Sequence, residues 1–497
     1  MKKNAFQEES IQKIQAAREV PEPHVNVEEV DLKRPERAHD GMLGKRIRKG
    51  VLIAVPVVLV TGIVVAGAML VTGTTFETER SFRRNSESFS ANVAKDIEAS
   101  SFKSLNSITY PDGTQYRRRE VSDAYKEGVL SFSNKIYQAT KKKGNFGFAP
   151  LPLYLNLDLV SLGTQKEKVR EEFNALLGGD YTLRAANFRS AYLSDYFYQE
   201  QGTLQIYNGV FLDDGRPDLG KLTPNPDFVK EMSRRYCEAY QLDYQNPEDV
   251  ARVASWANAK AGRDGFIDAR FLDVKPETAF QFVTTMYFNN QWASAFKTNS
   301  SYTAPFYGKQ IQEKVTYMQH TYRGAIYEYD KYVSVRDYYA NSMSIQYLVP
   351  KSTQDNIFDL LGDADFLHDE ESHLLKDSYA VELSVPKFTA TAETDFTKCL
   401  KEKFLPSAFA PFGNPMDAIF NENEDKSFWL DFSKQKNAIS FKEDGTEIVS
   451  VTVTSGYGAT SAAPVYGTYQ VNLNQPFVYC IYDSNGLPIY MGNVASI

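Results

Sequence analysis

Residues 471–494 read VNLNQPFVYCIYDSNGLPIYMGNV, and this stretch decides the fold. Two runs rich in β-branched and aromatic residues flank Ser484-Asn485-Gly486, where glycine supplies the positive φ of a tight turn. A β-hairpin is therefore expected near the end of the chain. Runs of the same composition predict further strands at 280–288, 342–349 and 379–385.

Helices are expected earlier in the chain. An apolar face at helical spacing runs through Val121, Tyr125, Val129, Phe132 and Ile136. A second helix is predicted over about 151–162, a third ends at Leu177 before two glycines, and another contains Trp256. Helices first and strands later, with helices interrupting again, indicate an α+β domain with a large sheet.

Composition excludes several classes of function. The 497 residues are 42% hydrophobic and 13% aromatic, which is enough for a packed core. The formal net charge of −8 disfavours a nucleic-acid partner, because binding to phosphates needs clustered cations. Cys237, Cys399 and Cys480 are far apart and form no metal-binding motif. We predict no catalytic residue, no cofactor and no metal site.

One segment, residues 51–72 (VLIAVPVVLVTGIVVAGAMLVT), contains no charged residue. A helix of about 33 Å would match a hydrocarbon core of about 30 Å. Basic residues crowd its N-terminal side, so the positive-inside bias places residues 1–50 in the cytoplasm and the rest outside. A cleaved signal peptide is the alternative, because residues 66–68 (AGA) resemble a cleavage site, although the charged leader is long for one.

The expected organisation has four parts. Residues 1–50 form a mostly disordered cytoplasmic leader, 51–72 a single transmembrane helix, 73–118 a Ser-rich extracellular stalk, and 119–497 the folded domain. The protein is therefore predicted to be a single-pass protein of the cell membrane, with its folded domain outside the cell.

Several blocks, in the right order, carry a resemblance to the serpin family. Asn474, Pro476 and Phe477 are similar to the family's C-terminal signature, and residues 490–494 (YMGNV) resemble its usual ending. Upstream blocks that fit are Phe288, Trp292, Phe296 and Phe306, residues 386–388, residues 404–409, and Asn145 with Pro150. The resemblance covers about 120–497. It implies the serpin fold, with a large central β-sheet A, further sheets, about nine helices and an exposed reactive-centre loop, here in a bacterial surface protein.

The resemblance also implies a hinge and a mechanism. Residues 443–447 (EDGTE) resemble the hinge before the serpin reactive loop, which we extend to Glu443, Gly445, Thr446, Glu447, Ile448, Val449 and Ser450. Residues 448–455 alternate with period two and are able to form a strand, in which the even-numbered residues from Thr446 to Thr454 would face inward. A protease that cuts the loop would stay attached as an acyl-enzyme. Insertion of about 14 residues at roughly 3.4 Å each would then carry it about 45–50 Å.

The scissile bond is expected at Ala459–Thr460, counting from Gly445 by the family's commonest spacing. Counting back from Pro476 puts it nearer Val465, so bonds 457–458 and 461–462 stay open as alternatives. Small residues at this place suit elastase-like or subtilisin-like serine proteases, with cysteine proteases as a second class of target. The protein itself is expected to be a monomer.

Two departures from the family pattern bear on inhibition. The hinge has Ile448, Val449 and Val451 where the family usually has alanines. The second departure lies in the region in which the sheet parts. The family commonly has Ser, Ser, Asn and His there, and this chain has, in the same order, Ala149, Pro152, Thr284 and Gln435. Of these four, Thr284 and Gln435 are still able to pair. A non-inhibitory serpin acting as a surface interaction module is therefore the alternative function.

Overall fold

The computed structural model describes residues 74–76, 102–109, 120–193, 202–216, 219–296, 301–362, 366–367, 374–421, 426–448 and 467–497. The predicted leader and the predicted membrane span lie outside these residues. In the part that is described, no helix is both long enough and apolar enough to span a bilayer.

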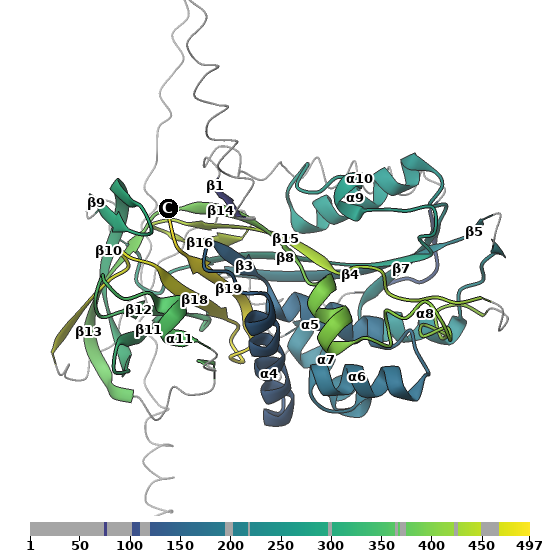
Figure 1. Ribbon diagram of the computed structural model, residues 1–497, viewed down its shortest axis with the longest axis horizontal. Helices are drawn as coiled ribbons and strands as arrows, with labels where there is room; N and C mark the ends of the chain where they lie inside the picture. Colours follow the sequence, from purple (N-terminus) through teal and green to yellow (C-terminus); the bar gives the residue numbers. More distant parts are fainter. Residues whose placement is uncertain are drawn as a thin grey trace, which may run out of the picture. The chain divides into compact units, whose positions relative to one another are not determined.

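Eight strands form the first sheet, which we call sheet A (Figure 1). Its order is β1 (Thr74–Phe76), β14 (Thr389–Asp395), β15 (Lys434–Phe441), β16 (Gly445–Ile448), β8 (Phe280–Gln291), β4 (Gly202–Asp213), β7 (Cys237–Leu242) and β2 (Lys103–Ser104). Neighbouring strands are antiparallel except β4 and β7, which are parallel. The central strand β8 carries no charged residue, which suits a strand covered on both faces.

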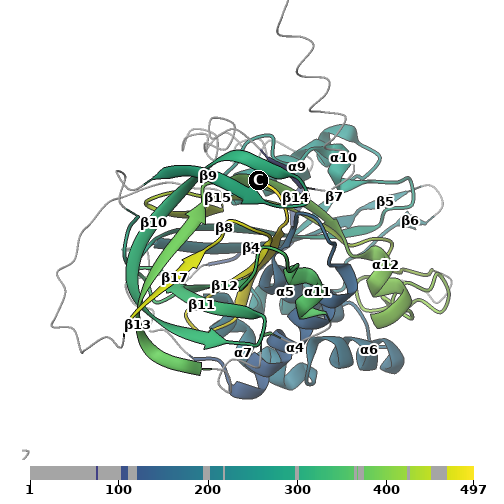
Figure 2. The ribbon, with the colours of Figure 1, turned by 60° about the vertical axis from the view of Figure 1, so that its left-hand side comes forward.

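The second sheet, which we call sheet B, has nine strands and curves beside the first (Figure 2). Its order is β17 (Thr468–Asn472), β13 (Leu374–Pro386), β10 (Ile311–Glu328), β11 (Tyr332–Tyr338), β12 (Ser344–Pro350), β18 (Phe477–Tyr482), β19 (Pro488–Val494) and β3 (Phe146–Phe148), with β9 (Tyr302–Tyr307) on β10. The predicted C-terminal hairpin is confirmed as β18 and β19, and Gly486 has a φ of 79° in its turn. A separate small hairpin joins β5 (Gly215–Arg216) to β6 (Gly220–Lys221).

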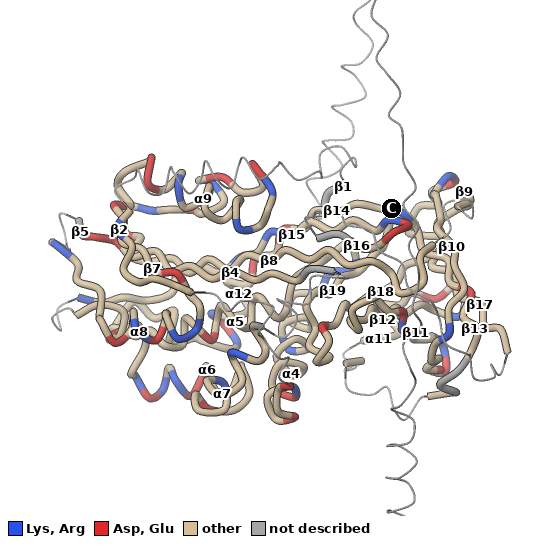
Figure 3. Tube along the Cα trace, turned by 180° about the vertical axis from the view of Figure 1, so that it is seen from behind, with Lys and Arg blue, Asp and Glu red and all other residues tan. Residues whose placement is uncertain are grey.

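Nine α-helices lie within the described residues. They are α4 (Asp123–Thr140), α5 (Pro150–Ser161), α6 (Glu167–Leu177), α7 (Tyr181–Leu193), α8 (Pro226–Arg234), α9 (Pro247–Ala261), α10 (Ala269–Leu272), α11 (Ile357–Leu361) and α12 (Thr397–Cys399), followed by a π-helical turn η3 (Leu400–Phe404). Helices α9 and α10 cover one face of sheet A, while α5, α7 and α8 lie on the opposite face (Figure 1). Charges of both signs occur along α6, α8 and α9 (Figure 3).

Helix α5 lies at the centre of the core. It starts with Pro150 in its first turn, where the missing N–H costs nothing, and it is apolar nearly all round. Eleven of its twelve residues are buried, so it packs against its neighbours on every side. Its one carboxylate, Asp158, forms ion pairs with Arg184 of α7 and with Arg235, which follows α8. These contacts fix α5 beneath sheet A.

The predicted stalk needs correction. Residues 74–76 pair with β14 as β1, and residues 103–104 pair with β7 as β2. These residues therefore belong to sheet A and not to a spacer. They cap its two opposite edges, so the folded region reaches back well before the expected boundary at residue 119.

Candidate functional site

The predicted hinge enters sheet A as a strand. Strand β16 pairs with β15 on one side, where Thr446 lies opposite Phe441, and with β8 on the other, where Thr446 lies opposite Asn290. The Thr446 side chain is fully buried. Because β15 and β8 flank it on both sides, this end of the segment already occupies a central position of the sheet.

Glycine is required where the chain turns into β16. The backbone of Gly445 and Lys442 makes two hydrogen bonds that close a tight turn, with N–O distances of 2.9 and 3.3 Å. A Cβ on Gly445 would lie 2.1 Å from the backbone oxygen of Asn290, in a neighbouring strand. No flexible group is available to move aside, so a side chain here would force β16 away from β8.

Polar contacts hold the turn before β16. Glu443 forms an ion pair with Lys387 at 3.0 Å. The indole nitrogen of Trp292 donates to the carbonyl oxygen of Lys442 at 3.0 Å. Partial burial alone would raise the pKa of Glu443, but its backbone hydrogen bond and Lys387 outweigh this effect and lower the pKa.

A buried acid–imidazole pair lies close to this turn. The Nε2 atom of His320 is 3.0 Å from Oδ2 of Asp337, and both side chains are 2% exposed. The ring of Phe296 stacks on His320, with centroids 3.9 Å apart. Burial raises the pKa of Asp337, although its contact with His320 opposes this shift.

Beyond β16 the two halves of sheet A are separate. In the described residues, β8 pairs with β4 and β16, and β15 pairs with β14 and β16, with no ladder joining β8 to β15. Residues 280–286 of β8 and 434–438 of β15 instead line a cavity of about 400 Å³. Residues of α5 and α9 line it too, and these helices cover opposite faces of the sheet, so the cavity passes through the layer.

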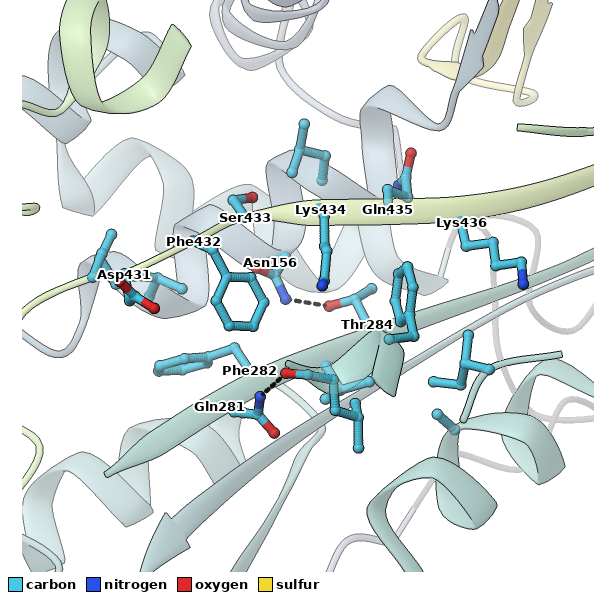
Figure 4. A pocket seen from close by; sticks show the side chains of 18 of the residues that line it. Asn156, Gln281, Phe282, Thr284, Asp431, Phe432, Ser433, Lys434, Gln435 and Lys436 are labelled. Carbon is cyan, nitrogen blue, oxygen red and sulfur yellow. Dashed lines mark hydrogen bonds between the residues drawn. The ribbon is translucent and has the colours of Figure 1, made fainter. Parts of the chain in front are cut away.

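The polar groups on the two sides of this gap have separate hydrogen-bond partners. Thr284 accepts a hydrogen bond from Asn156 of α5 at 3.0 Å and donates one to Asn208 of β4 at 2.8 Å. Gln435 bonds both backbone groups of Ala149, at 2.7 and 3.1 Å, and accepts from Asn437. Figure 4 shows Thr284 and Gln435 on separate strands, with Asn156 reaching Thr284. The pairing of Thr284 with Gln435 that the sequence left possible is therefore not formed in the described residues.

The comparison with protein families identifies the fold. The family model described as Serpin (serine protease inhibitor) matches residues 127–497. The chain belongs to the serpin family. The predicted serpin fold, with its large sheet A and about nine helices, is thereby confirmed for the described residues.

Known serpins resemble the chain at low identity. Serpin B11 of Mus musculus is 22% identical over 375 residues, covering 71% of this chain and 93% of the relative. Serine protease inhibitor 88Ea of Drosophila melanogaster is 24% identical over 382 residues, covering 71% and 85%. Thyroxine-binding globulin of Homo sapiens is 23% identical over 356 residues, covering 69% and 80%. A relative named as an inhibitor and a relative named for a ligand thus have similar sequence identity to this chain.

A solved serpin structure supports the fold. The native state of the thermophilic serpin tengpin matches with a TM-score of 0.63 at 19% identity, covering 77% of this chain and 96% of tengpin. This likeness concerns the arrangement of the backbone alone.

The serpin signature residues lie beside the C-terminal hairpin. Phe477 begins β18, is fully buried and pairs with Val494 of β19. The backbone oxygen of Asn474 accepts from the N–H of Tyr307 at 2.7 Å. Pro476 stands just before the strand, where its missing N–H breaks no ladder bond. In this serpin the signature therefore joins the end of β17 to the core of sheet B.

The described residues include only part of the predicted site. Of the predicted hinge, Glu443 lies in the turn, and Gly445, Thr446, Glu447 and Ile448 form β16. Val449, Ser450 and the predicted scissile bond Ala459–Thr460 lie outside the described residues. Sequence reasoning missed Asn156, Asn208 and Asn437 around the gap, because single asparagines in a helix or strand carry no recognisable pattern.

Proposed function

We propose that this serpin is held at the cell surface and inhibits serine proteases by covalent, single-use trapping. The observation that carries the proposal is the position of β16 between β15 and β8, directly above an open gap between the same two strands. A strand already started at one end of the gap can extend without any new nucleation, because successive added residues form ladder bonds alternately with β8 and β15.

The proposed chemistry starts with the target protease. Its serine hydroxyl oxygen bonds to the carbonyl carbon of Ala459 and, after the C–N bond to Thr460 breaks, the released amine leaves with the proton. The segment after Ile448 then enters the gap, and the acylated protease moves with it. Distortion of the protease active site on arrival prevents water from releasing it. Cysteine proteases, which form thioesters in the same manner, are a second class of target.

The decisive experiment mixes the full-length protein with a panel of elastase-like and subtilisin-like proteases. We expect a complex that survives SDS and boiling, and mass spectrometry of the released C-terminal peptide should locate the cut at Ala459–Thr460. A cut outside residues 456–466 would refute the placement of the bond. Clean cleavage by every protease, with no complex, would refute inhibition.

The second candidate function is a non-inhibitory surface module. It is favoured by the relative named thyroxine-binding globulin and by the β-branched residues in the hinge, of which Ile448 begins the departure from the usual alanines. The same mixing experiment separates the two candidates, because a module would be cleaved without retaining its protease.

The surface location rests on the sequence of residues 51–72 and its flanking charges. We expect the full-length protein in the membrane fraction, with its serpin domain accessible to protease added outside intact cells. Recovery of the protein in the medium, shortened at about residue 68, would favour the cleaved signal peptide instead.

A further inference from the structure

The cavity between β8 and β15 has a second polar face, which is turned toward α9. Thr284 and Gln435 point toward α5, as their hydrogen bonds show. Successive side chains of a strand point to opposite faces, so their neighbours Thr285 and Lys436 point toward α9. Figure 4 shows Lys434 and Lys436 extending from β15 on the side opposite to Gln435. Thr285 and both lysines line the cavity.

Thr285 and Lys436 lie at the same level of the gap. Thr446 of β16 pairs with Asn290 of β8 and with Phe441 of β15. Thr285 precedes Asn290 by five residues. Lys436 precedes Phe441 by the same number. Because β8 and β15 are both antiparallel to β16, they run in the same direction, and the two side chains face each other across the gap.

Lys436 is a cation without a counter-charge among the described residues. Its ammonium group lies 5.4 Å from the ring centre of Phe266 and forms no ion pair within the part of the chain that the structure describes. Lys275, which also lines the cavity, is by contrast paired with Asp431. An anion that enters the cavity would therefore meet a positive charge that is not neutralised.

Thr285 supplies a hydroxyl group at the same position. The residue is 8% exposed, and its Oγ1 atom has no hydrogen-bond partner within the described residues. A buried hydroxyl without a partner costs free energy, so the site favours a ligand that accepts a hydrogen bond from it. An ionised carboxylate only accepts hydrogen bonds and therefore suits both the hydroxyl and the ammonium group.

Aromatic rings form much of the remaining wall. Phe266 and Phe271 come from the chain after α9, and Phe428, Trp429 and Phe432 come from the chain before β15. Rings of this kind favour stacked or edge contacts with another ring. The volume of about 400 Å³ lies within the range of roughly 300–1,000 Å³ that is usual for small-molecule sites. The lining therefore favours a small ligand with an aromatic body.

We propose that this cavity binds a small aromatic carboxylate. Its carboxylate group accepts hydrogen bonds from the Lys436 ammonium and the Thr285 hydroxyl, and its ring packs among the aromatic side chains. The proposal goes beyond protease inhibition and does not depend on it, because it concerns the intact protein and no protease takes part.

The test measures binding of 2-naphthylacetate to the full-length protein in lipid nanodiscs by isothermal titration calorimetry, with empty nanodiscs as the blank. The control ligand is 2-(2-naphthyl)ethanol, which keeps the ring and lacks the charge. Lys436→Met removes the cation and keeps most of the side chain, whereas Lys436→Arg restores the charge. Thr285→Val removes the hydroxyl at nearly constant volume. The matched control is Lys398→Met, which changes an exposed lysine of α12 that does not line the cavity.

We expect Lys436→Met to bind the acid about tenfold more weakly or worse, as the loss of a hydrogen bond to a charged group implies. Thr285→Val should weaken binding about threefold to tenfold, as the loss of one neutral donor implies. Lys436→Arg should stay within about threefold of the wild type, because the charge is kept. Lys398→Met should bind as the wild type does, and the alcohol should bind more weakly than the acid and equally to the wild type and Lys436→Met.

Three results would overturn the proposal. Binding of the alcohol as tightly as the acid would refute the carboxylate position, and so would equal binding of the acid by the wild type and Lys436→Met. No heat above that of the empty nanodiscs would refute the cavity as a site for this ligand. If circular dichroism shows that Lys436→Met does not fold, Thr285→Val decides, and unchanged binding there would refute the site. The protease panel tests inhibition separately, so either proposal is able to fail without the other.

Discussion

Asp158 is a single carboxylate that forms ion pairs with two buried guanidinium groups. Its Oδ1 atom is 2.7 Å from Nε of Arg184, its Oδ2 atom accepts from Arg235, and it is itself fully buried. Asp158→Asn would leave two cations buried with no counter-charge from this residue, and we expect a loss of about 3–5 kcal/mol in the free energy of unfolding, measured in urea. The control is Asp359→Asn, which breaks the exposed pair with Lys143 and should cost below about 1 kcal/mol.

Glu443 gives the hinge turn a dependence on pH. Its pKa is lowered from 4.5, so the carboxylate stabilises the folded protein above that value, and this contribution is lost as the pH falls through the lower, folded-state pKa. Lys387→Ala should reduce the contribution, by at most about 1 kcal/mol because the pair is partly exposed. Urea unfolding at pH 7 and pH 3 would measure it. A Lys387→Ala effect of equal size at both pH values would contradict this assignment.

At the scale of one element, the pairing of β16 with β8 requires a glycine at residue 445, and this requirement can be tested. Gly445→Ala would place a methyl group 2.1 Å from the oxygen of Asn290, so we expect β16 to leave the sheet and the amides of residues 288–291 to exchange faster with solvent. With a protease target, more molecules should then be cleaved without trapping. The matched control is Gly467→Ala at the far end of the loop, where the nearest atom to a Cβ is 3.9 Å away on Tyr379. Equal exchange in both variants would show that the close approach does not matter.

The elements also show what the sequence could and could not predict. Helix α6 ends at Leu177 as expected, because Gly178 and Gly179 adopt φ values of 71° and 79° and give a local signal. Strands β1 and β2 are three and two residues long, too short for any alternation to be recognised. Their pairing comes from partners far along the chain, so the sequence alone indicates a stalk at these residues.

In the candidate site, too, the sequence predicts what a local run of residues signals and does not predict contacts with distant parts of the chain. The hinge was recognised from a run of neighbouring residues, whereas its insertion as β16 depends on β8 and β15. Gln435 bonds the backbone of Ala149, a residue 286 positions away, and Asn156 reaches Thr284 from a helix. Contacts of this kind leave no trace in the spacing of residues, so the sequence could not show which partners Thr284 and Gln435 have.

At the scale of the whole molecule, one N-terminal segment covers both edges of sheet A, the sheet that would accept a new strand under the proposed mechanism. Strand β1 caps β14, and strand β2 caps β7 at the opposite edge. The 26 residues from 77 to 102 would span about 86 Å if extended, whereas seven strand spacings amount to about 34 Å. The connection is therefore long enough to leave the sheet free to widen. Strands β1 and β2 cover edges of sheet A that would otherwise offer unpaired N–H and C=O groups to another copy of the protein.

A pair of truncations tests this edge cover. A protein starting at residue 74 keeps β1, and one starting at residue 77 loses β1 alone, so they differ by the three residues that pair with β14. We expect the shorter protein to form dimers and larger species as its concentration rises, because β14 becomes an open edge, and to melt at a lower temperature. The longer protein should remain a monomer in size-exclusion chromatography with light scattering. In the longer protein, a disulfide between Thr75→Cys and Thr391→Cys, which lie opposite each other, would lock β1 onto β14. It should keep this protein monomeric and raise its melting temperature. If both truncated proteins stay monomeric and melt together, β1 contributes nothing to the sheet edge, and residues 74–76 would again be best regarded as part of a spacer.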